Sequence, residues 1–333
     1  MKHNTIYRFS YKRYFYIIFF INKQIIPSSL RHIDVSRETS IYCSFTSITY
    51  YFYKKTASVS RETLAPLNTM LYNYSYGGKY MGKTISIFNQ KGGVGKTTTC
   101  VNFAACLGHK GKKTLLVDCD PQGNSTSGVG IDKSTLEASS YDILINDVAA
   151  KDVIIKTNFK NLSVLPANMD LAGAELELAD NENRFKALKK ALASVVMDYD
   201  YIIIDCPPSL GLLSLNALTA SDTLIVTLQC EYYALEGLSQ LLGTVRTVKQ
   251  HYNEHLELEG VLFTMFDTRL KLNQQVIDEV DNYFPNRAYK TKIPRSVKLA
   301  EAPSFGEPII YYEKYSKPSF AYKKFTDEFL KKQ

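Results

Sequence analysis

The sequence predicts an α/β fold over residues 81–333, in which a doubly wound, mostly parallel sheet is covered by helices on both faces. Short apolar runs alternate there with longer stretches of helical periodicity. The runs are apolar at consecutive positions, as expected of strands that are buried on both faces. The links from helix to strand at residues 108–113 and 197–200 are short, which suits this winding.

The expected elements follow one another along the chain. The apolar runs predict strands at residues 84–88, 114–117, 162–165, 201–204, 223–228 and 260–265. Helical periodicity predicts helices at residues 97–107, 183–196 and 235–251. Residues 319–333 carry aromatic residues at helical spacing beside several lysines, which indicates a terminal helix docked on the domain.

The first strand leads into a glycine-rich loop, Lys91-Gly-Gly-Val-Gly-Lys-Thr-Thr98, which opens the first helix. Glycines allow backbone N–H groups to converge on a phosphate, and a helix N-terminus favours the same anion. In the pattern G-x-x-x-x-G-K-[ST] the lysine reaches the β- and γ-phosphates and the hydroxyl binds Mg²⁺. The loop therefore predicts a nucleotide site formed by Lys91, Gly92, Gly93, Val94, Gly95, Lys96, Thr97 and Thr98.

This loop departs from the general pattern in one respect. Gln90 stands where the first glycine is expected, and Lys91 adds a second lysine inside the loop. A flexible loop without a ligand would explain the composition, but not a strand before it, a helix after it, and lysine and threonine in register.

Two carboxylate motifs follow later strands. They are Val117-Asp-Cys-Asp-Pro-Gln-Gly-Asn124 and Ile204-Asp-Cys-Pro-Pro-Ser-Leu-Gly211. Open α/β sheets bind ligands at the carboxyl ends of their strands, and Asp205 occupies the usual setting of a carboxylate that holds Mg²⁺ through water. Either motif alone is explained by a turn or helix-cap aspartate. Together with the loop, in this order, they favour one site.

The loop form K-G-G-x-G-K-[ST] resembles the deviant Walker A motif of the ParA/MinD/nitrogenase-iron-protein class of P-loop NTPases. Three further segments resemble the ParA/Soj-type chromosome or plasmid partitioning ATPases in particular: Phe266-Asp-Thr-Arg269, Ile293-Pro-Arg-Ser-Val-Lys298 and Leu299-Ala-Glu-Ala-Pro-Ser-Phe-Gly306. The resemblance covers most of residues 81–333. It implies a cytoplasmic, nucleoid-associated ATPase that uses ATP and Mg²⁺.

The resemblance also implies roles for single residues. Asp120 positions the attacking water, while Lys96 and Lys91 neutralise phosphate charge, Lys91 by crossing to the nucleotide of a second subunit. Thr97 and Asp205 hold Mg²⁺. These roles suit phosphoryl transfer, which depends on positioning and charge neutralisation more than on a strong base.

The resemblance implies that residues nearer the C-terminus contact the adenine of ATP and DNA. Met265 and Pro294 match positions that line the adenine pocket. Arg269 and Lys298 match positions of non-specific DNA binding, although the family often has arginine at the latter, and Arg295 is expected to contribute with them. A solvated surface of mixed charge would also explain these basic residues, because acids are interleaved with them. No helix-turn-helix pattern is evident, so the expected contacts are to phosphates.

The implied partners are a second copy of the chain in an ATP-dependent homodimer, a ParB-like protein that stimulates hydrolysis, and non-specific double-stranded DNA, without stable membrane association. Two other functions stay open: a MinD-like membrane ATPase, whose basic amphipathic helix would be residues 319–333, and a non-hydrolysing DNA-bound regulator. A reductase of the iron-protein type needs a cluster-binding cysteine between the two aspartate motifs, and residues 121–205 contain none.

The composition divides the chain near residue 80. Residues 1–80 carry 11 Lys/Arg and 3 Asp/Glu, whereas residues 81–333 carry 29 and 30. The pentapeptide Val-Ser-Arg-Glu-Thr occurs at residues 35–39 and 59–63, and one codon choice for it contains a palindrome that resembles the parS site of ParB proteins. We therefore expect residues 1–80 to be translated upstream DNA, with synthesis starting at Met81; a disordered leader is the alternative.

Six cysteines are spread along the chain without C-x-x-C or ligand spacing, at Cys43, Cys100, Cys106, Cys119, Cys206 and Cys230. This pattern predicts reduced, mostly buried thiols and no disulfide framework.

Overall fold

The computed structural model describes residues 82–231, 234–270 and 272–333, and the structural statements below concern these residues. Residues 1–80 lie outside them. The expectation that these residues are translated upstream DNA or a leader therefore stays a prediction.

The strands of the described residues form one seven-stranded sheet in the order β3-β4-β2-β5-β1-β6-β7. Neighbouring strands are parallel, apart from the short edge strand β3, which runs antiparallel to β4. The strands are β1 (Lys83–Phe88), β2 (Thr114–Asp118), β3 (Ile155–Lys156), β4 (Leu162–Leu165), β5 (Tyr201–Asp205), β6 (Thr223–Gln229) and β7 (Glu257–Thr264). Because β1 lies inside the sheet and later strands extend it on both sides, the predicted doubly wound fold is confirmed.

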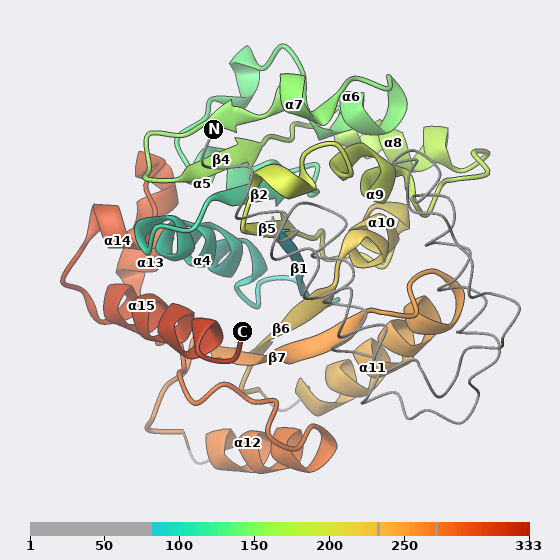
Figure 1. Ribbon diagram of the computed structural model, residues 1–333. Helices are drawn as coiled ribbons and strands as arrows, with labels where there is room; N and C mark the ends of the chain where they lie inside the picture. The colour runs from blue at the N-terminus through green and yellow to red at the C-terminus, as the bar shows by residue number, and fades with distance from the viewer. Residues whose placement is uncertain (1–81, 232–233, 271) are drawn as a thin grey trace, which may run out of the picture. The chain divides into compact units, whose positions relative to one another are not determined.

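Helices cover both faces of this sheet (Figure 1). The α-helices of the described residues are α4 (Lys96–His109), α5 (Asn124–Gly128), α6 (Ser140–Ile145), α7 (Ala150–Val153), α8 (Leu171–Leu178), α9 (Ala187–Leu192), α10 (Leu212–Ala220), α11 (Ala234–His251), α12 (Leu272–Tyr283), α13 (Val297–Glu301), α14 (Ile309–Tyr312) and α15 (Lys317–Leu330). Short 3₁₀ turns occur at η2 (Lys133–Thr135), η3 (Val196–Asp198) and η4 (Ala302–Phe305).

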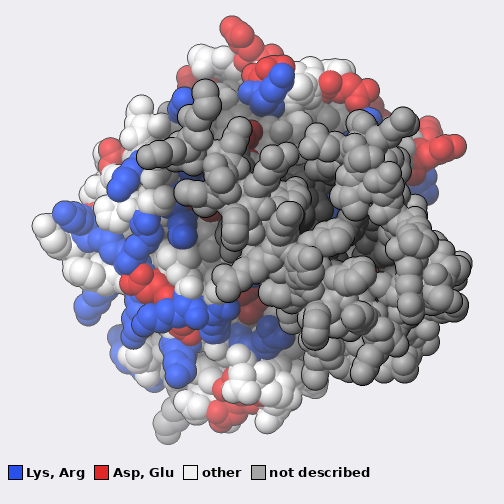
Figure 2. Space-filling model, viewed as in Figure 1, with Lys and Arg blue, Asp and Glu red and all other residues white. Residues whose placement is uncertain are grey.

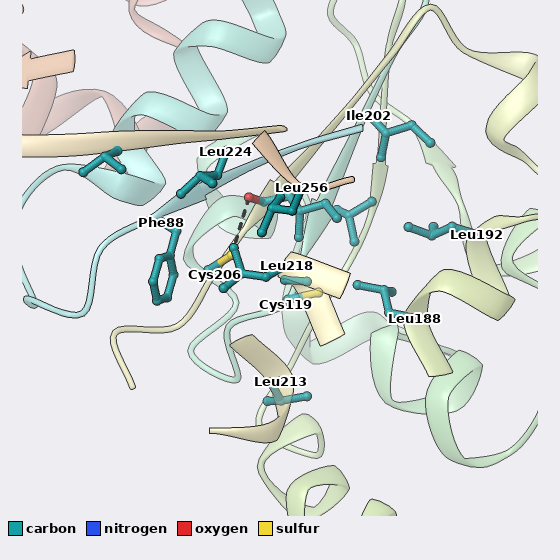
Figure 3. Packing of buried hydrophobic residues seen from close by; sticks show 14 of the residues in the cluster. Phe88, Cys119, Leu188, Leu192, Ile202, Cys206, Leu213, Leu218, Leu224 and Leu256 are labelled. Atoms are coloured by element: carbon teal, nitrogen blue, oxygen red, sulfur yellow. Dashed lines mark hydrogen bonds between the residues drawn. The ribbon is translucent and has the colours of Figure 1, made fainter. Parts of the chain in front are cut away.

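Each face of the sheet has its own hydrophobic core, because successive strand residues point to opposite sides. In β5, Ile202 and Ile204 pack with the side that carries α9 and α10, whereas Ile203 packs with the α4 side. Figure 3 shows part of the first core, where Cys119 and Cys206 lie beside Leu218. The predicted burial of the cysteines is confirmed for the five in the described residues.

The C-terminal helix α15 is docked on α4, and Figure 1 shows the two side by side. The ring of Phe103 in α4 lies 4.9 Å from that of Phe325 and 5.0 Å from that of Phe329, measured between centroids. Phe325 and Phe329 are fully buried, whereas Phe320 on the outer side is 54% exposed. The apolar stripe of this helix is therefore used as core. Among the described residues, no helix is long and apolar enough to cross a membrane.

The structure differs from the sequence prediction in detail. The helix expected at residues 183–196 is reduced to α9, with turns before it and η3 after it. The strand β7 ends one residue earlier than expected, at Thr264, because Met265 takes a left-handed conformation with φ 47°. A β strand cannot continue through that geometry.

Candidate nucleotide site

The glycine-rich loop joins the end of β1 to the start of α4. Gly93 and Gly95 have φ of 74° and 81°, a left-handed backbone that costs glycine little and other residues more. A Cβ placed on Gly92 or Gly93 would meet no atom within 4 Å. The loop is therefore curved around open space at the N-terminus of α4, as an anion site requires.

Lys96 is buried at the base of this loop, with 6% of its surface exposed. Its Nζ donates a hydrogen bond to the carbonyl oxygen of Lys91 at 3.1 Å. Burial lowers the pKa of Lys96, while the nearby Asp205, Cys206 and Asp120 raise it and so offset part of that effect. A phosphate bound in the loop would therefore stabilise the charged ammonium group of Lys96, which has lost its water on burial.

Asp205 ends β5 beneath the loop and is fully buried. The hydroxyl of Thr97 donates to its carboxylate, and Ser125 Oγ donates to Oδ2 at 2.7 Å. Burial raises the pKa of Asp205, and the bonds from Ser125 and Thr97 oppose that rise. The hydroxyl of Thr97 and the carboxylate of Asp205 are oxygen donors of the kind that suits Mg²⁺, so these residues fit the expected metal.

The two aspartates at the end of β2 have different surroundings. Asp118 is fully buried, and its Oδ2 accepts the backbone N–H of Thr126 at 2.8 Å and the hydroxyl of Thr126 at 2.7 Å. Burial, and then the charge of Asp205, raise the pKa of Asp118. Asp120 is 8% exposed and accepts the backbone N–H of Gln122 at 2.9 Å. The carboxylate of Asp118 therefore holds the backbone and side chain of Thr126, whereas the charge of Asp120 lies close enough to Lys96 to raise the pKa of that lysine.

The entry to the loop is bound to β6 and the residues that follow it. Three successive loop residues contact this wall, in the pairs Asn89 with the Thr227 carbonyl (2.7 Å), Gln90 with Thr244 (2.7 Å) and Lys91 with Glu231. Gln90, which replaces the expected glycine, thus anchors the loop to α11. The Lys91–Glu231 ion pair is half exposed, with 42% of each side chain accessible.

Met265 and Pro294, expected near the adenine, lie in adjoining segments. Phe266 and Pro294 form a parallel bridge, and the Phe266 N–H donates to the Ile293 carbonyl at 2.9 Å. Thr264 links this edge to the loop, because its hydroxyl donates to the Val94 carbonyl at 2.8 Å. The structure therefore places both residues on the side of the site that β7 forms.

The three residues expected to contact DNA are exposed. Arg269 donates two hydrogen bonds to Asp267, which lower the pKa of that carboxyl to about 2, and Arg295 adds to this effect. Lys298 Nζ lies 2.9 Å from Glu301 Oε2. Figure 2 shows Lys and Arg side chains gathered over the region of α13 to α15, with Asp and Glu between them. Basic residues with acids between them fit either a DNA-binding face or a solvated surface of mixed charge, so the expected DNA contacts stay a prediction.

The structure thus brings the loop, Asp120 and Asp205 together at the carboxyl ends of β1, β2 and β5, which are adjacent strands. Sequence reasoning did not name Ser125, Thr264 or Glu231. No spacing signal marks these residues, because each contacts a residue at least 80 positions away.

Comparison with known proteins agrees with this geometry. A family model described as an AAA domain matches residues 82–258. The Bacillus subtilis sporulation initiation inhibitor protein Soj is 59% identical over 242 residues, which are 73% of this chain and 96% of that protein. The Myxococcus xanthus chromosome partitioning protein ParA is 50% identical over 252 residues, 76% of this chain and 89% of that one.

A solved structure from Mycobacterium smegmatis, described as cobyrinic acid a,c-diamide synthase with bound ADP and magnesium, is 39% identical. It covers 75% of this chain and 95% of its own, with a TM-score of 0.67. With the deviant loop, the two aspartate motifs and a doubly wound sheet in place, this chain belongs to the ParA/Soj family of chromosome-partitioning ATPases.

Proposed function

We propose that this protein is an ATP-dependent DNA-partitioning switch, in which an ATP-bound dimer holds DNA without sequence preference and a ParB-like partner stimulates hydrolysis. One observation carries the proposal: the two lysines of one loop have different surroundings. Lys96 is buried beneath the loop, whereas the amine of Lys91 lies at its exposed entry. In this proposal Lys96 binds the nucleotide of its own subunit and Lys91 reaches that of a second subunit.

The chemistry of the site supports ATP hydrolysis with Mg²⁺. Thr97 and Asp205 would hold the metal, with Ser125 orienting Asp205. The bound metal would neutralise phosphate charge. Asp120, whose charge acts on Lys96 and which is 8% exposed, would orient water. If the nucleotide is held between two subunits, the dimer forms only when ATP is bound. The protein then changes state with its nucleotide, as a switch does.

The basic face supports DNA binding through phosphates. Arg269, Arg295 and Lys298 are exposed, and the bridge between Phe266 and Pro294 brings the first two together around Asp267. Dimerisation doubles such a face and so strengthens contacts that are weak on one subunit. Each phosphate contact contributes about 0.9 to the slope of log affinity against log salt on duplex DNA.

The test uses two variants with opposite expected defects. Lys91→Ala should bind ATP but fail to form the dimer, because the contact to the second nucleotide is lost while Lys96 stays in place. Arg269→Glu with Lys298→Glu should form the dimer but lose DNA binding and DNA-stimulated, ParB-assisted turnover. Sedimentation with a slowly hydrolysed ATP analogue and gel shifts at two salt concentrations measure both. DNA binding by the double variant at the affinity of the natural protein would refute the proposed face.

A further inference from the structure

The exposed ion pair at the loop entry, Lys91 with Glu231, is unexplained by nucleotide binding alone. Among the described residues, Glu231 is the one acid whose side chain contacts the Lys91 amine. It stands just after β6, in the wall that also holds Asn89 and Gln90. The pair therefore joins the exposed end of the Lys91 side chain to its own subunit.

The backbone of Lys91 is fixed, so that a change of partner involves the side chain. Its N–H donates to Asn89 Oδ1 at 3.0 Å, and its carbonyl accepts from Lys96 Nζ at 3.1 Å. Asn89 is itself held by the Thr227 carbonyl. The side chain beyond this anchored backbone is half exposed and bonded only at its tip.

We propose that Glu231 is the counter-ion that holds Lys91 in its own subunit and thereby opposes formation of the nucleotide-dependent dimer. The inference rests on the proposed function, since it assumes that Lys91 binds the nucleotide of a second subunit.

Two effects of Glu231 act in the same direction. Lys91 must give up a charge-assisted hydrogen bond before its amine can reach a phosphate of the partner. The carboxylate of Glu231 also remains at the entry, where it repels the incoming polyphosphate. The dimer contains two such sites, so each effect contributes twice to the free energy of dimer formation. Glu231 thus sets how much free energy ATP must supply before two subunits associate.

The expected size follows from the exposure of the pair. Exposed ion pairs contribute little free energy each, and the dimer contains two Lys91–Glu231 pairs. Converted to a binding constant, their loss lowers the dimer dissociation constant by about two- to thirtyfold when Glu231 is neutralised. Glu231→Gln keeps the size of the side chain and removes its charge. The difference between variant and natural protein should shrink at high salt, because exposed charges are screened. A purely structural defect would not respond to salt in this way.

A matched control is available at the other end of α4. Lys110 and Asp327 form an ion pair of similar exposure, 38% and 46%, about 20 Å along the helix from the loop. Asp327→Asn removes one exposed acid from the protein without touching the site, so it corrects for the change in net charge. It should leave the dimer constant unchanged.

The experiment measures the dimer dissociation constant by sedimentation, with Mg²⁺ and a slowly hydrolysed ATP analogue, at low and high salt. Affinity for ADP, measured by calorimetry on the monomer, should be equal in Glu231→Gln and the natural protein. A tighter dimer in Glu231→Gln, relative to Asp327→Asn, supports the inference. An equal or weaker dimer overturns it while leaving the proposed function intact. If the natural protein and both variants stay monomeric with the analogue, the proposed function and this inference fail together.

Discussion

Asp118 and Asp120 stand two positions apart, yet their hydrogen bonds assign them different work. The carboxylate of Asp118 accepts the backbone N–H of Asp120 at 3.2 Å and both the N–H and the hydroxyl of Thr126. Asp120 keeps a single backbone bond and lies nearer the surface. A buried carboxylate that satisfies several donors is a structural group, whereas a carboxylate with fewer internal donors keeps its oxygens available for a ligand.

We predict that Asp118→Ala lowers the free energy of unfolding by about 1–3 kcal/mol, because buried donors of Thr126 lose their acceptor. Asp120→Ala should change stability by less than about 1 kcal/mol but reduce ATP turnover by roughly a hundredfold or more. Urea unfolding and phosphate release measure the two effects. Equal losses of stability in both variants would contradict this division of roles.

At the scale of elements, α15 shows that one pattern of aromatic residues can serve either membrane binding or core packing. The aromatic residues of α15 have the spacing of a membrane-binding helix, but Phe325 and Phe329 close the core over Phe103. The same helix bonds to the segment before α13, since Glu328 accepts the N–H groups of Lys290 and Thr291 at 2.8 and 2.9 Å. The C-terminal helix therefore supports the segment that carries the basic face.

We predict that Phe325→Ala and Phe329→Ala each lower the free energy of unfolding by about 3–5 kcal/mol, as expected for a large buried side chain. Phe320→Ala, on the exposed side of the same helix, should stay within about 0.5 kcal/mol of the natural protein. Urea titrations of the three variants make the comparison. A large cost for Phe320→Ala would show that its ring is buried by a contact absent from the single chain.

At the scale of the whole molecule, the site belongs to the folded state, because its parts come from three adjacent strands. A ligand that binds only the folded protein stabilises it according to the ratio of ligand concentration to dissociation constant. We predict that Mg²⁺ with a slowly hydrolysed ATP analogue, at about a hundred times its dissociation constant, raises the melting temperature by roughly 5–10 °C.

Lys96→Ala is the control for this shift, since it removes the buried cation of the loop and should abolish the increase. Scanning fluorimetry with and without the analogue measures both proteins. A full shift in Lys96→Ala would mean that the nucleotide is held by other groups.

The cysteines give a second measure of the folded state. Burial raises the pKa of Cys106 and Cys206 to about 12 and that of Cys230 to about 11, and it raises the pKa of Cys100 and Cys119 well above the usual value. We predict that these five thiols stay protonated and unlabelled by iodoacetamide at about pH 8 in the folded protein, and react in urea. Mass spectrometry after timed labelling identifies each site. Rapid labelling of Cys206 without denaturant would contradict its burial beneath the loop.

The sequence was sufficient for the sheet and for the core of the site, because both depend on local signals. Consecutive apolar residues identify a strand such as Tyr201–Asp205, and a glycine-rich loop before a helix identifies a phosphate site. The edge strand β3 has two residues and no periodicity to detect. Ser125 and Glu231 acquire their roles from contacts with Asp205 and Lys91, which only the three-dimensional fold brings near.

Because β1 lies between β5 and β6, the glycine-rich loop that follows β1 is completed only by strands that are synthesised later. The phosphate loop leaves the ribosome early, but the carbonyl of Val94 receives its bond from Thr264, which lies 170 residues further along. At ordinary rates of synthesis that interval is roughly 10–30 s, and such long-range parallel pairings also form slowly. Throughout this interval the glycine-rich loop lacks its contact with Thr264 of β7. The bond that Thr264 gives to the loop can therefore form only after β7 has been made.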